Sequence, residues 1–200
     1  GLGPNPLQNY YGGTKLQMLF SAAELSALGL VSGAPITSVG LHLANADNGY
    51  ALQGLTIKMK NTTTAALTSS GWETGLTTVK APASYSPVVG LNTFTLDQPF
   101  DWDGTSNLVI EFNYSNNNTG TNAGVFNRAL HSPTSFVSSA MYRGDNVSQA
   151  TVDGYTNNPS FTYSSRNDVT FTTGSPNITW SPVTGLFTDA AATIPYAGGP

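Results

Sequence analysis

The sequence predicts an all-β protein, a two-sheet antiparallel β-sandwich of the jelly-roll type, and three observations support this. Apolar and polar residues alternate in short runs, Gly, Asn, Ser and Pro separate the runs, and one short segment alone has a helical pattern. The clearest run, 108–114, places Val109, Glu111 and Asn113 on the face opposite Leu108. A period of two is typical of a strand with one buried face, so we expect a half-buried strand here.

Further runs of the same character are expected to form the remaining strands. In the run 52–60, Leu55, Ile57 and Met59 share one face while Lys58 lies on the other, and in the run 38–43 His42 faces outward. The other expected strands are 15–20, 77–80, 92–96, 124–130, 135–142, 160–164 and 168–172.

The single helical pattern lies near 22–28 and begins with a capping box. The Ser21 hydroxyl can accept from the Glu24 amide, and the Glu24 carboxylate can accept from the Ser21 amide. Leu25 and Leu28 supply a small apolar face, and Gly29 is suited to follow the last turn. We expect a short helix with a structural role that caps one end of the sandwich.

The composition excludes several classes of protein. Charged residues are 9% of the chain, against roughly 25% in typical soluble domains. The net charge is −4 and the seven lysines and arginines are scattered singly, so there is no basic stripe for nucleic acid. There is no cysteine, hence no disulfide or thiolate site, and no apolar run long enough to span a membrane. A low-charge chain rich in Thr, Asn and Gly favours an exported protein, extracellular or at the cell surface, over a cytosolic enzyme.

The character of the chain changes near its end. Gly174 opens a linker-like Gly-Ser-Pro-Asn break, and a strand-like run begins at Ile178. A tail of this length cannot form its own core. We therefore expect a β-sandwich module over 1–173, with 174–200 forming a linker and the first strand of a following module, or a docked tail.

An acidic turn precedes the strand 108–114 and is a candidate calcium site. Asp101, Asp103 and Asn107 supply oxygen atoms close together, as Ca²⁺ requires, with Gly104 allowing a sharp turn. The alternative is an Asx-rich turn whose carboxylates accept backbone N–H groups. Calcium is the one cofactor that the sequence suggests.

Aromatic residues in or beside loops are the candidate ligand-binding residues, because an aromatic face can stack on a sugar ring. Trp102, flanked by Phe100 and the following strand, is instead expected to pack at an end of the sandwich. The candidates are Trp72, Tyr50, Tyr85 and Tyr155.

The residues of catalysis do not form a recognisable set. Glu73 with Asp101 or Asp103 is the only carboxylate pairing that retains a case for a glycosidase. His42 and His131 have neither a Ser or Cys partner in a motif nor metal-ligand spacing. We therefore expect a protein that is not an enzyme.

Several motifs together resemble a known group of modules. They are the segments 10–11 and 15–25, the strand 57–62 with its Ile-Lys-Met-Lys-Asn-Thr sequence, and the Pro-Phe-x-Trp-Asp-Gly-Thr-Ser-Asn-Leu turn at 99–108. Over roughly 10–171 the chain resembles β-sandwich modules of large secreted proteins of Bacteroidetes-type bacteria. Related modules often carry a cysteine pair that is absent here.

The resemblance implies a module of an extracellular, adhesin-like protein exported by type IX secretion, and it makes the tail similar to the start of an Ig-like repeat. It implies no catalytic residues. The expected function is a non-catalytic structural or adhesive module whose partners are neighbouring modules of the same polypeptide or another surface protein. The alternative is a carbohydrate-binding module that tethers a secreted hydrolase to polysaccharide.

Overall fold

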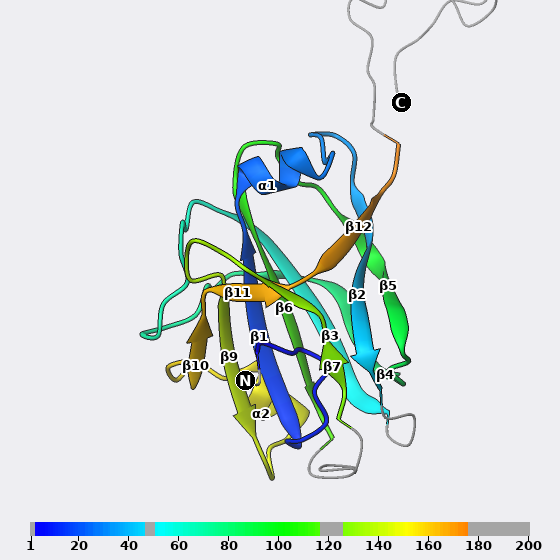
Figure 1. The fold of residues 1–200 in the computed structure, drawn as a ribbon, viewed down its shortest axis with the longest axis vertical. Coiled ribbons are helices and arrows are strands. Elements are labelled where there is room, and N and C mark those ends of the chain that lie inside the picture. Colours follow the sequence, from blue (N-terminus) through cyan, green and yellow to red (C-terminus); the bar gives the residue numbers. More distant parts are fainter. Residues whose placement is uncertain (1–2, 47–50, 117–125, 176–200) are drawn as a thin grey trace, which may run out of the picture.

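The computed structural model describes residues 3–46, 51–116 and 126–175. These residues form antiparallel β-sheets with two short helices, and the two larger sheets pack face to face as a sandwich (Figure 1). The predicted fold class, an all-β sandwich, is therefore confirmed.

The larger sheet has six strands, every neighbouring pair antiparallel. In spatial order they are β10 (Phe161–Tyr163), β9 (Ser139–Gly144), β1 (Gly13–Phe20), β6 (Asn107–Ser115), β3 (Leu52–Thr62) and β4 (Thr77–Tyr85).

The opposing sheet is smaller, and a two-stranded ribbon accompanies it. The sheet contains β12 (Val169–Thr173), β2 (Ile36–Asn45) and β5 (Gly90–Phe100), with the short β7 (Arg128–Ala129) also pairing with β2. The ribbon pairs β11 (Ser165–Asn167) with β8 (His131–Pro133).

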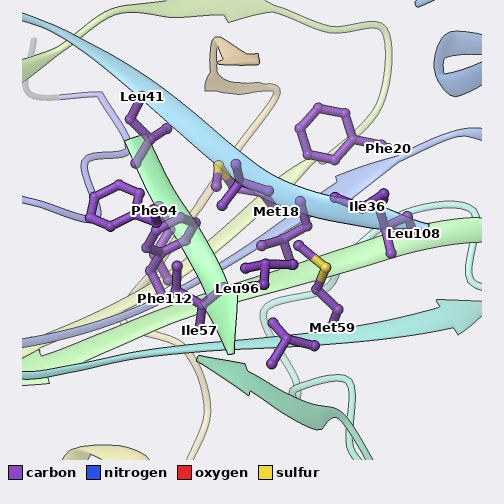
Figure 2. Close-up of a cluster of buried hydrophobic side chains, with 14 of the residues drawn as sticks. Met18, Phe20, Ile36, Leu41, Ile57, Met59, Phe94, Leu96, Leu108 and Phe112 are labelled. Atoms are coloured by element: carbon purple, nitrogen blue, oxygen red, sulfur yellow. The ribbon is translucent and has the colours of Figure 1, made fainter. Parts of the chain in front are cut away.

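The main core lies between the two sheets (Figure 2). Phe94 of β5 meets Phe112 of β6 across the interface, with ring centroids 5.6 Å apart. Trp102 is 2% exposed, and its indole N–H donates to the Ser106 carbonyl at 2.7 Å. The expectation that Trp102 packs at an end of the sandwich is confirmed, and His42 is exposed as predicted.

The predicted helix is present as α1 (Ala22–Ala27), with both hydrogen bonds of the capping box. The Arg166 guanidinium from β11 also pairs with Glu24, at 2.7 Å. Burial alone would raise the pKa of Glu24, but the hydrogen bonds from Arg166 and Ser21 and the charge of Arg166 lower it to about 2.

A second helix, α2 (Gln149–Asp153), was not predicted. Its N-cap is Ser148, whose side chain accepts from the Thr151 amide, and Val152 is its buried residue. One buried apolar residue in a polar stretch leaves no helical period in the sequence. The helix is held by tertiary contacts with β6 and β1.

Strand boundaries differ from the predictions where Pro or polar residues interrupt the pattern. β4 continues through Pro82 to Tyr85, because an edge strand tolerates a residue that cannot donate to the ladder. β9 begins four residues later than the expected strand 135–142. Of the expected strand 124–130, only 126–130 is described, and its paired part is β7.

The expectation that β6 is half-buried is wrong. Val109, Glu111 and Asn113 lie on the outer face of the six-stranded sheet, yet they are 0%, 2% and 0% exposed. The segment 63–76 covers this face near Val109, and α2 with the residues after it covers the remainder. The outer face of the larger sheet is therefore a second buried layer, and it contains the site described below.

The last described strand, β12, ends at Thr173. The expected second module over 174–200 lies outside the described residues, apart from 174 and 175. Within the described ranges, no helix combines the length and apolar character needed to cross a bilayer.

Candidate functional site

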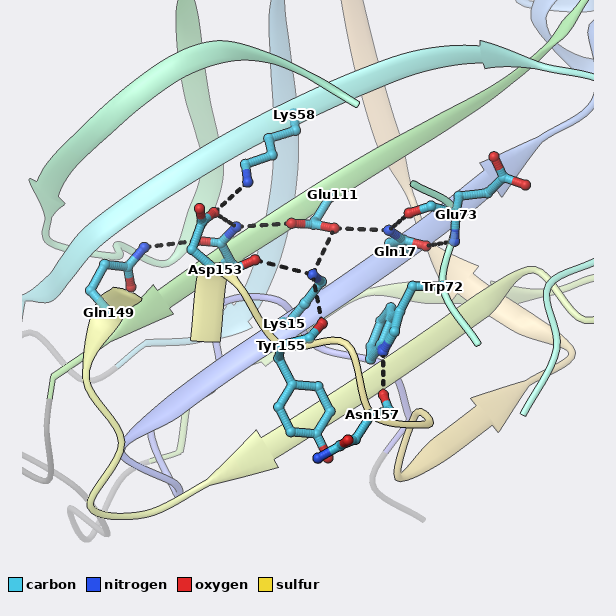
Figure 3. Close-up of polar contacts among 11 residues, drawn as sticks. Lys15, Gln17, Lys58, Trp72, Glu73, Glu111, Gln149, Asp153, Tyr155 and Asn157 are labelled. Carbon is cyan, nitrogen blue, oxygen red and sulfur yellow. Dashed lines mark hydrogen bonds and ion pairs between the residues drawn. The ribbon is translucent and has the colours of Figure 1, made fainter. Parts of the chain in front are cut away.

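A layer of paired charges lies on the outer face of β1, β6 and β3, and Glu111 is at its centre (Figure 3). Its Oε2 accepts from the Gln17 amide at 2.8 Å and lies 3.5 Å from Lys15 Nζ, while Oε1 accepts from Asn113 at 3.0 Å. Strand register produces this cluster: Gln17 stands opposite Glu111, and Lys15 stands opposite Asn113. A buried carboxylate is tolerated because each of its oxygens has a partner.

Lys15 joins this layer to the segment that follows α2. Its ammonium group donates to the carbonyls of Asp153 and Tyr155, each at 3.2 Å. It also lies 5.2 Å from the centroid of the Trp72 ring, within the range of a cation–π contact. One buried cation therefore contacts both the Trp72 ring and the backbone of Tyr155.

A second ion pair extends the layer toward β3 and α2. Lys58 Nζ lies 2.5 Å from Asp153 Oδ1, which also accepts from Asn113 at 2.9 Å. Gln149 of α2 donates to the side-chain carbonyl of Asn113 at 2.8 Å. These contacts explain why so short a helix forms where it does.

Glu73 is the third carboxylate of this face and belongs to the covering segment 63–76. It pairs with Lys60 Nζ at 2.9 Å and accepts from the hydroxyls of Thr62 and Thr64. Burial alone would raise its pKa, but the hydrogen bonds from Thr64 and Lys60, with the charge of Lys60, lower the pKa below its usual range. A general acid needs a raised pKa, so Glu73 is unsuited to that role.

Trp72 and Tyr155 meet above the charged layer. Their ring centroids are 6.4 Å apart with an interplanar angle of 83°, and the Tyr142 ring stacks on Tyr155 at 3.6 Å. The Trp72 indole N–H donates to the Asn157 carbonyl at 2.7 Å. The indole donor is thus engaged within the protein, while Trp72 and Tyr155 both remain partly exposed.

Together these residues enclose a cleft of about 430 Å³, called here the Trp72 cleft. This volume is within the range of small-ligand sites, ~300–1,000 Å³. Trp72 and Tyr155 line it, as do two lysines and two glutamates whose charges sum to zero: Lys15, Lys58, Glu73 and Glu111. The cleft is therefore aromatic and polar, with no net charge to recognise an ion.

The other candidate aromatic residues do not reach this cleft. Tyr85 packs on Phe94 with ring centroids 4.6 Å apart, and its hydroxyl donates to Asn92 at 2.9 Å. Tyr85 is partly buried and packs against the main core between the two sheets. Tyr50 lies outside the described residues.

The acidic turn forms the backbone-bonded arrangement. Asp103 Oδ1 accepts from the amides of Thr105 at 2.8 Å and Ser106 at 2.7 Å, and hydrogen bonds from Ser106 and Thr105 lower the pKa of Asp103 to about 2. Asn107 accepts from the Ala22 amide and donates to a carbonyl of the covering segment, both at 2.8 Å. Asp101 is exposed. Across the described residues, no three His, Cys, Asp or Glu side chains gather as a metal site requires.

Sequence reasoning identified Trp72 and Tyr155 but missed the charges beneath them. Lys15 and Glu111 are 96 positions apart, and only strand register brings them together. One signal was available: Val109 is apolar although it lies on the polar face of its strand, and in the structure it packs with Leu19 under the covering segment.

No protein-family model, no curated protein and no solved structure matches this chain. The function is therefore inferred from the residues of the chain and their geometry.

Proposed function

We propose that this chain is a non-catalytic adhesive module of an extracellular protein, and that it binds a neutral carbohydrate in the Trp72 cleft. The observation that carries the proposal is the pairing of two partly exposed aromatic rings above a charged floor with zero net charge. Aromatic rings present apolar faces to sugar rings, and fixed polar groups beside them select orientation.

The proposal excludes catalysis because of the partners that the two carboxylates of the cleft have. Glu111 and Glu73 are each bound to a lysine and to further donors, and the lowered pKa of Glu73 keeps it ionised. A glycosidase needs one carboxyl that holds a proton near neutral pH. Glu73 lacks the environment of such an acid, and Glu111 is held in place by Lys15, Gln17 and Asn113.

The extracellular setting is part of the same proposal. It is supported by the low charge, by the composition rich in Thr, Asn and Gly, and by the resemblance to secreted Bacteroidetes-type modules. Carbohydrate binding and adhesion are compatible in such a module, because a surface protein that binds polysaccharide adheres to it. The neighbouring modules of the polypeptide would then supply avidity.

The test is a glycan array probed with the whole chain, once with calcium and once with a chelator. We expect neutral glycans to bind in both conditions, with calorimetric affinities for the best glycan weakened about tenfold or more by Trp72→Ala. Tyr85→Phe is the matched control, since Tyr85 lies outside the cleft. If no neutral glycan binds, or if Trp72→Ala binds as well as the wild type, the proposal is wrong and the layer serves structure alone.

A further inference from the structure

A second cavity, of about 630 Å³, lies where the N-terminal segment meets β9 of the larger sheet and the β2–β7 pair of the smaller sheet. Pro4 comes from that segment, Ala44 from the end of β2, Arg128 from β7, and Met141 and Arg143 from β9. Its volume is also within the range of small-ligand sites. We call it the arginine cavity.

The charge of the arginine cavity distinguishes it from the Trp72 cleft. Of the seven lysines and arginines, five pair with a carboxylate: Lys15, Lys58, Lys60, Lys80 and Arg166. The remaining two, Arg128 and Arg143, have no carboxylate partner among the described residues, and both line this one cavity. None of the described residues that line it is acidic, whereas the chain as a whole has a net charge of −4.

Arg143 is held in a fixed orientation. Its guanidinium lies between two aromatic rings, 4.8 Å from the centroid of Tyr11 and 4.3 Å from that of Phe161. Its Nε is buried and has no hydrogen-bond partner within the described ranges. The nearby Asp145 accepts from the Gly12 amide at 2.9 Å instead. A stacked guanidinium keeps its N–H edge in one plane, which suits a carboxylate.

The rest of the lining has a larger share of apolar residues, with amide side chains among them from Asn5, Gln8, Asn9 and Asn127. Tyr10, Phe126, Leu130 and Met141 contribute side chains, and Tyr10 is 45% exposed. A ligand that fills this space therefore needs an apolar body as well as a negative charge. His131 adds an imidazole at the same wall.

We propose that the arginine cavity binds a small organic carboxylate with an apolar body, whose carboxylate pairs with Arg128 and Arg143. The site is separate from the Trp72 cleft in position, charge and ligand class. It therefore stands or falls independently of the sugar proposal.

The test uses two matched probes, 3-phenylpropionate and its neutral amide, 3-phenylpropionamide. Each is titrated into the ¹⁵N-labelled chain, and amide chemical shifts are followed. We expect the acid to bind with millimolar affinity and to shift the amides of Arg128, Ala129 and Arg143, and the amide to bind at least about tenfold more weakly. D-Glucuronate, whose carboxylate sits on a polar ring, is expected to bind more weakly than the aromatic acid.

Variants assign the charge. Arg128→Gln removes an exposed cation and is expected to weaken binding of the acid about tenfold. Lys80→Gln removes the same charge from a residue outside the cavity and is expected to leave binding unchanged. The proposal is overturned if the acid and the amide bind equally, or if glucuronate binds as tightly as the acid. It is also overturned if the chemical shifts that change belong only to residues outside the cavity, or if Arg128→Gln binds the acid as tightly as the wild type. Trp72→Ala, which tests the sugar site, is expected to leave this binding intact.

Discussion

Substituting Lys15 with Met should destabilise the fold more than any other removal of a single positive charge. Lys15 and Glu111 form an ion pair at 3.5 Å, and their side chains are only 8% and 3% exposed. Removing one partner of a buried pair costs about 3–5 kcal/mol, because the remaining charge stays buried without its counter-ion. Glu111 keeps hydrogen bonds from Gln17 and Asn113. We therefore expect Lys15→Met to lower the free energy of unfolding by about 3 kcal/mol, near the lower end of this range.

The assay is urea and thermal unfolding followed by circular dichroism. For a chain of this size the loss corresponds to a fall in Tm of about 6–12 °C. Lys80→Met is the matched control: its pair with Asp97 is 3.8 Å long and Asp97 is half exposed, so about 0.5 kcal/mol is expected. In the double variant that combines Lys15→Met with Glu111→Gln, the free energy of unfolding should fall by less than the sum of the falls in the two single variants. Additive losses, or a Lys15→Met variant no less stable than Lys80→Met, would refute the reasoning.

Three further predictions concern α1 and the acidic turn. Against the effect of burial, Arg166 and the hydrogen bonds from Ser21 lower the pKa of Glu24 from 4.5 to about 2, so the stability that ionised Glu24 contributes is present above pH 4.5 and lost as the pH falls toward 2. The urea midpoint should therefore fall less steeply with falling pH in Glu24→Gln than in the wild type, and an identical pH dependence would contradict this. Gly104→Ala should lower the free energy of unfolding by about 1–2 kcal/mol, because Gly104 has φ +83° and an added Cβ would lie 2.9 Å from the Cβ of Ser32. An unchanged Tm would contradict this prediction. Calcium or a chelator should leave Tm unchanged, because Asp103 already accepts backbone amides; a calcium-dependent rise would restore the calcium hypothesis.

The sandwich itself could be predicted because its strands carry a local signal. Period-two alternation separates Ile57 from Lys58 without any knowledge of the partner strand, and the capping box at Ser21 depends on residues three positions apart. Such features are properties of short windows. The helix α2 has no such signal, because its single buried side chain, Val152, gives no period.

The site could be predicted only in part, for a related physical reason. Trp72 and Tyr155 were recognisable as loop aromatics, but Tyr85 has the same signature and packs against Phe94 instead. All three rings are partly buried, but Trp72 and Tyr155 line the Trp72 cleft whereas Tyr85 packs against the main core, and this difference depends on contacts between distant segments. The pairing of Lys15 with Glu111 likewise follows from the register of β1 on β6, which no single window encodes.

The central claim, that the Trp72 cleft binds a neutral sugar, has a direct measurement in the indole N–H signals of a ¹⁵N-labelled sample. The best neutral glycan from the array is titrated in, and Trp72→Phe assigns the Trp72 signal. We expect that signal to shift and saturate while the Trp102 signal stays in place, because Trp102 is 2% exposed and lies in the core. A bound glycan that leaves the Trp72 signal unmoved would contradict the proposed site.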